Sequence, residues 1–381
     1  FRSLVLVDAP CTGTGTWRRN PDAKWRMRPG ALEQRIKDQD KVLDEAARIE
    51  GHPEGSKGLS LFYIPMRDEK GRLQNLEVMR LKDKLGTRAM PTAELFLKRT
   101  SAKLVGGELH GVRKIASLFN ITRMYNSVCA LGAARRALAL AVDYSRRRAA
   151  FGKRLLELPL HVETLSDLVV DFEAGFLLTF HLAELLGRDE LGKASPEESA
   201  MLRMLTPIAK LYTGKMAMTI TSEVLEVFGG AGYMEDSGIP VLHRDAQVFS
   251  IWEGTTNVLS LDVIRAIEKE GAFPPFVKGI LQLVSKIKGF DAEVAKIKNQ
   301  CSDLGSFLQK AQGEGSDFVQ ASARKFSLAL GRALSGALLL ERAFLDQSPR
   351  SAEIARRWCG VPVALGFSSQ EHRNLSRLLI G

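Results

Sequence analysis

The segment LVLVDAPCTGTGTWRR, from Leu4 to Arg19, places an acid and a thiol where a ligand could bind. Its continuous apolar residues predict a buried strand, and Asp8, Pro10 and Cys11 follow at the carboxyl end of that strand. Open α/β folds bind ligands at this edge of the sheet, and a loop rich in basic residues and tryptophan suits phosphates and bases. The simpler alternative is a short strand with a buried cysteine and a solvated basic loop.

The segment IWEGTTN contains an acid that could act as a general base. Ile251 and Trp252 precede Glu253, and they predict apolar surroundings in which a carboxylate can be tuned for proton transfer near neutral pH. Thr255 would place a hydroxyl beside the free amides of a helix N-terminus, where anionic oxygens can dock. The alternative is aromatic core packing beside an exposed acid.

Two further stretches offer groups suited to an anionic or planar ligand. The stretch RRRAAFG ends a long basic helix, and Arg148 there offers a planar fork that matches a pyrophosphate. The stretch EVLEVFGGAG ends another helix, and Gly229 and Gly230 would let backbone amides approach a ligand closely. Taken singly, each has a simpler explanation, because arginines complement the dipole at a helix C-terminus and glycines commonly end helices.

Helical periodicity predicts the elements that would position these groups. Apolar residues three and four positions apart predict long helices over 122–148 and 161–187. Further helices are predicted over residues 196–227, 256–270, 275–288, 291–311, 316–345 and 369–379. The chain from about Gly111 onward is therefore expected to be almost wholly helical.

The residues before Gly111 have a different pattern. Strands are predicted over 59–65, 76–82 and 93–98, separated by charged or glycine-containing turns that favour antiparallel pairing. A strand over 1–10 and a helix over 31–50 together predict half of a βαβ unit. The expected fold is mainly α, with a partial antiparallel β-region and an amino-terminal strand and helix.

Composition sets broad limits on function. The chain has 381 residues and a formal net charge of +10, which suits anionic partners, whether nucleic acid or a phosphate-bearing cofactor. Its four cysteines are scattered, so neither a disulfide framework nor a metal site is predicted, and a reducing compartment is expected. No apolar run is long enough for a membrane span, and no targeting segment is seen, so we expect a cytoplasmic protein, or a mitochondrial one in a eukaryote. Because Phe1 already lies in a strand-like run, we expect a fragment.

The stretch VDAPCTGTGTWRRNPDAKW resembles the Pro-Cys motif region of the Sun/Nop family of RNA 5-methylcytosine methyltransferases, over residues 1 to about 51. In that family the cysteine that matches Cys11, directly after Pro10, assists release of the methylated base. The family's attacking cysteine lies in a Thr-Cys-Ser motif, and S-adenosylmethionine binds an earlier glycine-rich loop. Neither is found in these residues, so we expect a Rossmann-like remnant without methyl transfer.

The three downstream stretches, taken together, resemble the acyl-CoA dehydrogenase family, and KLGTRAMPTAELFLK at 84–98 resembles the end of its middle β-domain. The resemblance implies a four-helix carboxyl-terminal bundle with FAD held partly across a subunit interface. It therefore implies an acyl-CoA substrate and a homo-oligomer, either a dimer or a tetramer. The residues that it implies for FAD are Arg148, Phe151, Gly229, Gly230, Thr255 and Asn257.

The resemblance also implies the chemical roles. Glu253 would be the base that removes the α-proton of a thioester while the β-hydrogen leaves as hydride to the flavin. Arg123 would lie near the acyl-CoA. Some members carry the base on the long helix instead, but the matching position here is Thr122, so Glu253 has no rival.

Two departures from the common family pattern, Pro159 and Glu226, resemble the DNA-alkylation-response branch of the family. That branch carries additional carboxyl-terminal helices and a basic surface able to bind DNA. The basic stretches of residues 271–381 are compatible with nucleic-acid binding. The alternative, which we prefer, is a helical module for packing or oligomerisation.

The expected organisation is a methyltransferase-like fragment over 1–51, a partial β-domain over 52–110, a helical bundle over 111–270 and a helical tail over 271–381. The family's amino-terminal domain and its flavin-clamping loop are not found, so we expect weak or absent FAD binding by this chain alone, and an inactive relative as one outcome. The expected function is α,β-dehydrogenation of an acyl-CoA by an FAD-dependent enzyme. The alternative is a methyltransferase-derived or nucleic-acid-associated protein.

Overall fold

The computed structural model describes residues 44–361, which fall into two compact units that divide between Asn120 and Ile121. The predicted strand over 1–10 and the predicted helix over 369–379 lie outside the described residues, as do Pro10 and Cys11.

The first unit contains two small antiparallel sheets. One has the strand order β1 (Asp44–Arg48), β2 (Leu59–Tyr63), β5 (Lys103–Val105). The other pairs β3 (Leu76–Leu81) with β4 (Ala93–Leu97). The three predicted strands are thus present, but β2 pairs with β1 and β5 and not with β3 or β4.

Strand β1 corrects one prediction. The helix predicted over 31–50 is wrong for residues 44–48, which pair in antiparallel register with β2, from Asp44 opposite Tyr63 to Arg48 opposite Leu59. Helix propensity differs between ordinary residues by less than about 1 kcal/mol per residue. The backbone hydrogen bonds offered by the free edge of β2 outweigh it, and this partner cannot be read from the local sequence.

A short helical segment completes the first unit. The 3-10 helix η2 (Ser56–Gly58) leads into β2, and helix α3 (Gly111–Lys114) packs on β2. A Cβ atom at Gly111 would lie 2.6 Å from the backbone carbon of Ser60, so the close approach of α3 to β2 requires glycine.

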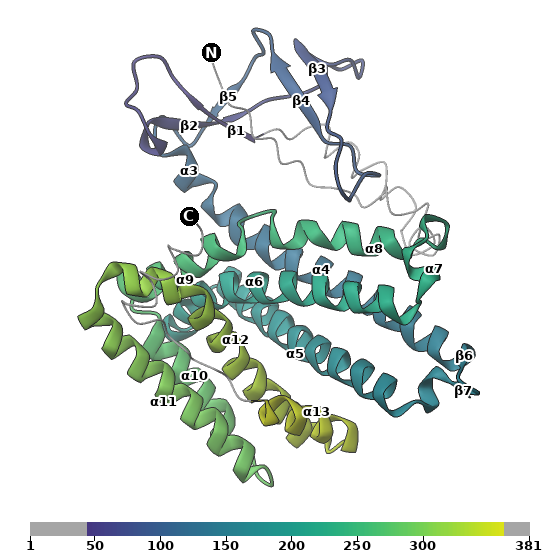
Figure 1. The fold of residues 1–381 in the computed structure, drawn as a ribbon. Coiled ribbons are helices and arrows are strands. Elements are labelled where there is room, and N and C mark those ends of the chain that lie inside the picture. The colour runs from purple at the N-terminus through teal and green to yellow at the C-terminus, as the bar shows by residue number, and fades with distance from the viewer. Residues whose placement is uncertain (1–43, 362–381) are drawn as a thin grey trace. The chain divides into compact units, whose positions relative to one another are not determined.

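The second unit is built from long helices, and the predicted predominance of helix is confirmed (Figure 1). Helix α4 begins just before the boundary between the units, and the two-residue strands β6 and β7 form a hairpin between α4 and α5. The helices are α4 (Ala116–Arg147), α5 (Pro159–Glu190), α6 (Pro196–Val227), α7 (Gly230–Tyr233), α8 (Ile239–Ala246), α9 (Thr256–Glu270), α10 (Phe273–Ser285), α11 (Asp291–Glu314), α12 (Ser316–Asp346) and α13 (Pro349–Gly360). The smaller elements are β6 (Ala149–Ala150), β7 (Lys153–Arg154), η3 (Leu155–Glu157), η4 (Glu235–Ser237) and η5 (Gln247–Ser250).

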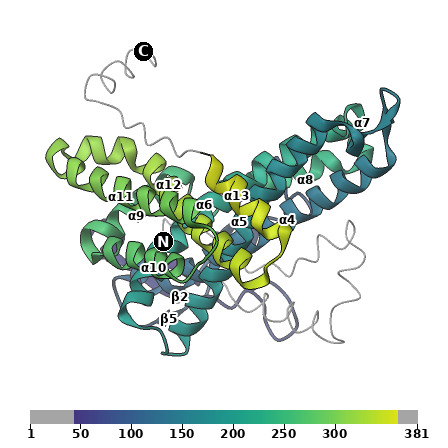
Figure 2. The same ribbon diagram turned by 90° about the horizontal axis from the view of Figure 1, so that it is seen from below.

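Helix α6 is the central helix of this unit. It packs against α5, α8, α9, α10 and α12 (Figure 2), and every residue from Met204 to Gly214 is buried. A helix that is buried all round belongs to the core and not to a surface. Its start is fixed locally, because Ser195 and Glu198 form a reciprocal capping box around Pro196.

Some helices were missed or shifted by the periodicity. The predicted bounds 196–227 and 256–270 match α6 and α9, whereas α10 lies a few residues before the predicted 275–288. Helices α8 and α13 were not predicted. Both are short, and a segment of 8 or 12 residues gives few turns from which a helical period can be recognised.

Arginines of the carboxyl-terminal helices are largely engaged within the unit. The Arg332 guanidinium lies 4.0 Å from the ring centroid of Trp358, and the Trp358 indole donates to the Arg332 carbonyl at 3.1 Å. Arg357 of α13 forms an ion pair with Glu163 of α5 at 2.8 Å. These contacts dock α13 on the bundle, which favours the packing module over nucleic-acid binding for these two arginines.

Glycine at position 214 is required where η5 crosses α6. A Cβ atom there would lie 2.8 Å from the backbone oxygen of Phe249. We expect Gly214→Ala to destabilise the fold by about 1–3 kcal/mol in chemical denaturation, because the backbone of η5 must move. In the control, Gly187→Ala in α5, the new methyl group meets nothing within 4 Å, so that variant should be neutral or up to about 1 kcal/mol more stable. Equal effects of the two substitutions would contradict the tight crossing.

Candidate active site

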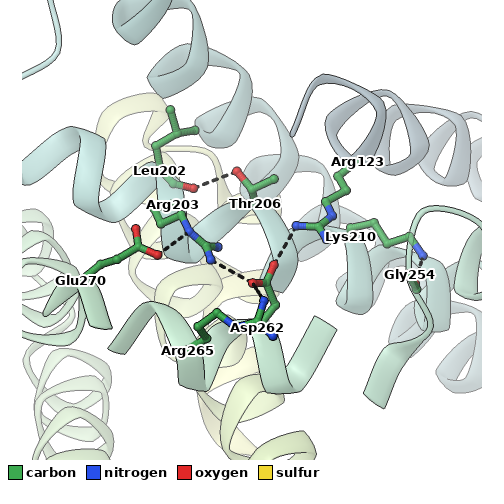
Figure 3. A network of polar contacts seen from close by, with 9 residues as sticks. All are labelled: Arg123, Leu202, Arg203, Thr206, Lys210, Gly254, Asp262, Arg265 and Glu270. Carbon is green, nitrogen blue, oxygen red and sulfur yellow. Dashed lines mark hydrogen bonds and ion pairs between the residues drawn. The ribbon is translucent and has the colours of Figure 1, made fainter. Parts of the chain in front are cut away.

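A buried carboxylate joins three helices of the second unit (Figure 3). Asp262 of α9 accepts a hydrogen bond at 2.8 Å from Arg123 of α4 and another at 2.8 Å from Arg203 of α6. Arg203 also donates to Glu270 at 2.9 Å, and Arg265 lies 3.6 Å from Asp262. The Asp262 and Arg123 side chains are only 10% and 14% exposed, so this is an interior ion-pair network.

The two arginines determine the charge of Asp262. Burial alone would raise the pKa of the Asp262 carboxyl, but hydrogen bonds and charge attraction from Arg203 and Arg123 outweigh burial, and the pKa lies below its ordinary value. Asp262 is therefore ionised at neutral pH, and each of its oxygens has a cationic partner. Sequence reasoning proposed Arg123 for a role near substrate but missed Asp262 and Arg203.

Lys210 is a second buried cation, located two turns after Arg203 on the same face of α6. Its side chain is fully buried, and Nζ donates a hydrogen bond of 2.5 Å to the carbonyl oxygen of Gly254. Burial, together with repulsion from Arg123, lowers the pKa of Lys210 to about 8, although attraction from Glu253 opposes this shift. Sequence reasoning missed this lysine; the available signal was a second cation seven residues after Arg203, at the end of the mostly apolar stretch MLTPIA.

The Glu253 loop has an unusual backbone. Glu253 has a φ of 60°, a left-handed conformation that costs a non-glycine residue about 1–3 kcal/mol, and Gly254 follows with a φ of 111°. The Glu253 side chain is half-buried. The apolar shielding predicted from its two neighbours is not observed, because Ile251 is 61% and Trp252 is 39% exposed. Both side chains turn outward because the loop leaves the core at the end of η5.

Thr255 and Asn257 lie where α9 begins. Both are exposed, and the Thr255 hydroxyl makes no capping bond with the helix. The amides of the first turn of α9 are consequently available to a ligand, together with that hydroxyl. Arg123, Glu253, Thr255 and Asn257 thus belong to the same end of the bundle, since Arg123 is tied to α9 through Asp262.

The other predicted cofactor residues lie at the opposite end of the bundle. Tyr144, one turn before Arg148, stacks on Phe228, directly before Gly229, with ring centroids 4.4 Å apart. Figure 1 shows α7 and the β6–β7 hairpin toward the same end of the bundle. Phe151 occupies the tip of the hairpin with a φ of 54° and is 94% exposed.

The groups at this second end are open. Arg148 is exposed, and its guanidinium has no partner among the described residues. A Cβ atom added at Gly229 or Gly230 would meet nothing within 4 Å. The backbone there can therefore be approached by a ligand or by another chain.

The two sets of residues cannot meet within one copy of the chain. Arg123 and Arg147 are near the two ends of the continuous helix α4, and its rise of about 1.5 Å per residue separates them by about 36 Å. The structure brings together Arg123 and Glu253 with the start of α9. It places Arg148 and Phe151 with the glycine turn at the far end.

Two polar groups on α4 have unmet hydrogen-bonding capacity. Nε of Arg123 and both amide atoms of Asn126 are buried without a hydrogen-bond partner among the described residues. Residues three apart share one face of a helix. Buried polar groups usually have partners, so this face fits a bound polar molecule or ordered water.

Within residues 44–361, no three His, Cys, Asp or Glu side chains gather in a way that would hold a metal ion. No helix in the same range is long and apolar enough to cross a membrane.

Three family models match the chain. The model described as acyl-CoA dehydrogenase, C-terminal domain, matches residues 110–268, and acyl-CoA dehydrogenase 11 C-terminal domain-like matches residues 271–377. The model described as 16S rRNA methyltransferase RsmB/F matches residues 3–56, most of which lie outside the described residues.

Individual relatives are similar over the same part of the chain. Acyl-CoA dehydrogenase family member 11 of Caenorhabditis elegans is 44% identical over 316 residues, which are 80% of this chain and 51% of that protein. The crystal structure of C. elegans ACDH-11 in complex with C11-CoA superposes with a TM-score of 0.82 at 41% identity, covering 86% of this chain and 58% of that one. AidB of Escherichia coli is 34% identical over 64% of this chain and 44% of its own length. The chain thus spans about half the length of these relatives.

The network around Asp262 should dominate the stability of this end of the bundle. We expect Asp262→Asn to lower the free energy of unfolding at pH 7 by about 3 kcal/mol, because Arg123 loses its counter-charge in the interior and Arg203 keeps only Glu270. Glu268→Gln, on an exposed position of the same helix, is the control and should change it by less than about 0.5 kcal/mol.

The same pair of proteins tests the charge of Asp262. Its lowered pKa contributes stability above the ordinary value of 3.8, and this contribution is lost as the pH falls through the folded-state pKa. The difference between wild type and Asp262→Asn should therefore shrink below that pH in denaturant titrations. A difference that is constant down to acid pH would contradict an ionised Asp262.

Proposed function

Residues 110–377 belong to the acyl-CoA dehydrogenase family, and we propose that this chain forms the carboxyl-terminal part of an enzyme that oxidises the Cα–Cβ bond of an acyl-CoA thioester. The observation that carries the proposal is the Glu253 loop. It holds a half-buried carboxylate in a strained backbone conformation and is fixed to the core by the Lys210–Gly254 hydrogen bond. Strain of this kind is retained at functional sites when the surroundings enforce it.

Glu253 is the proposed base. Its carboxylate has no cation within ion-pair distance among the described residues, so no partner must be displaced before it takes a proton. The buried cation Lys210 donates to the carbonyl oxygen of Gly254, the residue directly after Glu253, and attraction from Glu253 acts on its ammonium group. Glu253 would remove the proton on the carbon next to the thioester carbonyl and hold it on a carboxylate oxygen.

FAD is the proposed cofactor, as in other members of the family, and when bound it supplies the acceptor for the hydride that leaves the β-carbon. The residues present fit this group. Arg148 has a free guanidinium for a pyrophosphate, and the glycine turn is open to close approach. The free amides at the start of α9 and the Thr255 hydroxyl suit anionic or carbonyl oxygens.

A homo-oligomer follows from the separation of these groups. The Arg148 end and the Glu253 end lie about 36 Å apart along α4, farther than one dinucleotide reaches. A second copy would bring its Arg148 and Phe151 to the Glu253 end of the first. The 94% exposure of Phe151 supports a contact of this type, because an exposed aromatic at a rigid hairpin tip is a common interface anchor.

The proposed substrate is a long or medium-chain acyl-CoA. The C. elegans relative was solved with C11-CoA, and the unpaired Nε of Arg123 with the unpaired Asn126 amide would offer donors near the base. Arg123 is already held by Asp262, so it would act as a fixed donor and not as a mobile one.

The role of Glu253 is tested with C11-CoA as the substrate and a dye as the electron acceptor, on protein supplied with FAD. We expect Glu253→Gln to lower kcat by about 10²–10⁴-fold, because the amide cannot accept the α-proton. The affinity for C11-CoA, measured by calorimetry, should stay within about twofold, since size and shape are kept. Glu268→Gln, on an exposed acid of α9, is the control. Wild-type turnover in Glu253→Gln would refute the assignment.

The role of Arg148 is tested by FAD binding, which is followed by quenching of flavin fluorescence. A charge-assisted hydrogen bond contributes about 1.5–3 kcal/mol, so we expect Arg148→Ala to weaken FAD binding about tenfold or more. Arg135→Ala removes an exposed arginine from the middle of α4 and should leave the affinity unchanged. Equal weakening by both variants would indicate a general effect of charge and would contradict a specific site.

A further inference from the structure

We propose that Lys210 is the positioning residue for Glu253: its ammonium group fixes the Gly254 carbonyl, so that the loop keeps its conformation while Glu253 gains and loses a proton. This inference rests on the proposed function of Glu253. Lys210 belongs neither to the motifs recognised in the sequence nor to the ion-pair network around Asp262, so its role is assigned from the structure alone.

The geometry gives the first argument. A lysine that is fully buried in the core has lost its water, and its ammonium must find acceptors inside the protein. Its acceptor is the carbonyl oxygen of Gly254, at 2.5 Å, and Gly254 directly follows the strained Glu253. Because Gly254 follows Glu253, holding this carbonyl fixes the peptide plane on which the direction of the Glu253 side chain depends.

The loop is held at a second point as well. Gly214, one turn after Lys210 on α6, lies against the backbone of Phe249 in η5, where even a Cβ atom would not fit. Helix α6 thus contacts the chain on both sides of Glu253, through Phe249 before it and Gly254 after it. Glu253 therefore lies in a short segment, between Phe249 and Gly254, both ends of which contact α6.

The charges give the second argument. Two groups act on Lys210: Arg123 from α4 repels it, and Glu253 from the loop attracts it. Arg123 is largely neutralised by Asp262, at 2.8 Å, so its repulsion is reduced. Lys210 therefore stays a cation near neutral pH, where the ionised Glu253 is its attractive partner.

The proton balance follows from this arrangement. During the proposed reaction a proton moves from the substrate α-carbon to a Glu253 oxygen, and Lys210 keeps its own proton throughout. Once Glu253 is neutral, Lys210 has lost this attraction, and its pKa falls from about 8.

The first experiment measures the titration of Lys210 itself by side-chain NMR of uniformly ¹⁵N,¹³C-labelled protein, with the signal assigned through its scalar correlations to the Lys210 backbone. We expect a midpoint near 8 in the wild type and a lower midpoint in Glu253→Gln, because the attractive charge is gone. Lys215, half-buried on the same helix, serves as the internal control and should titrate identically in both proteins. An unchanged Lys210 midpoint in Glu253→Gln would overturn the proposal.

The second experiment measures the loop by amide hydrogen exchange. In Lys210→Met, the amides of residues 252–256 should exchange about tenfold faster or more, since a buried hydrogen bond from a charged donor contributes about 1.5–3 kcal/mol. Lys215→Met should leave these amides within about twofold of the wild type. Equal exchange in the two variants would overturn the proposal. If Lys210→Met does not fold, the titration of Lys210 in folded Glu253→Gln still tests whether Lys210 positions Glu253.

These readouts separate the inference from the proposed function. If Glu253→Gln retains turnover while the Lys210 midpoint shifts and the loop exchanges faster, the base assignment fails and the anchoring role of Lys210 stands. If turnover is lost but neither readout changes, Glu253 is the base and Lys210 does not position it.

Discussion

This end of the bundle depends on one buried carboxylate, which accepts a hydrogen bond from a different arginine on each of its two oxygens. Asp262 of α9 binds Arg123 of α4 and Arg203 of α6, each at 2.8 Å. Burying three charges is costly unless every one is paired, and breaking such a group leaves uncompensated charge in the core. The network therefore permits only a narrow range of relative positions for the three helices, and it is these helices that surround the Glu253 loop.

The strained conformation of the Glu253 loop depends on this rigidity. A glutamate at a φ of 60° would relax if it were free, but the crossing at Gly214 and the Lys210–Gly254 hydrogen bond hold the chain on both sides. Strain, buried cations and a half-exposed acid thus occur together within a few residues. Each is unfavourable for stability by itself, and their coincidence supports the choice of this loop as the candidate site.

The molecule places its remaining ligand-binding groups far from this loop. Arg148 and Phe151 are fixed beside the glycine turn by the Tyr144–Phe228 stack, at the other end of α4. A long continuous helix is a rigid spacer, so the distance between the ends is not closed by bending. This separation of Arg148 from Glu253 is the basis of the proposal that two copies of the chain complete one site.

Local sequence determined much of the fold and the positions of the motifs. The capping box at Ser195 and the apolar period define α6, and Glu253, Arg148 and the glycine turn were recognised from their types and order. Tertiary structure decided the rest. Residues 44–48 form a strand because they pair with the free edge of β2. Ile251 and Trp252 are exposed, although their residue types predicted burial. Asp262 and Lys210 acquired their roles only when folding placed them against Arg123 and Gly254, because charge pairing depends on distance in space and not on spacing along the chain.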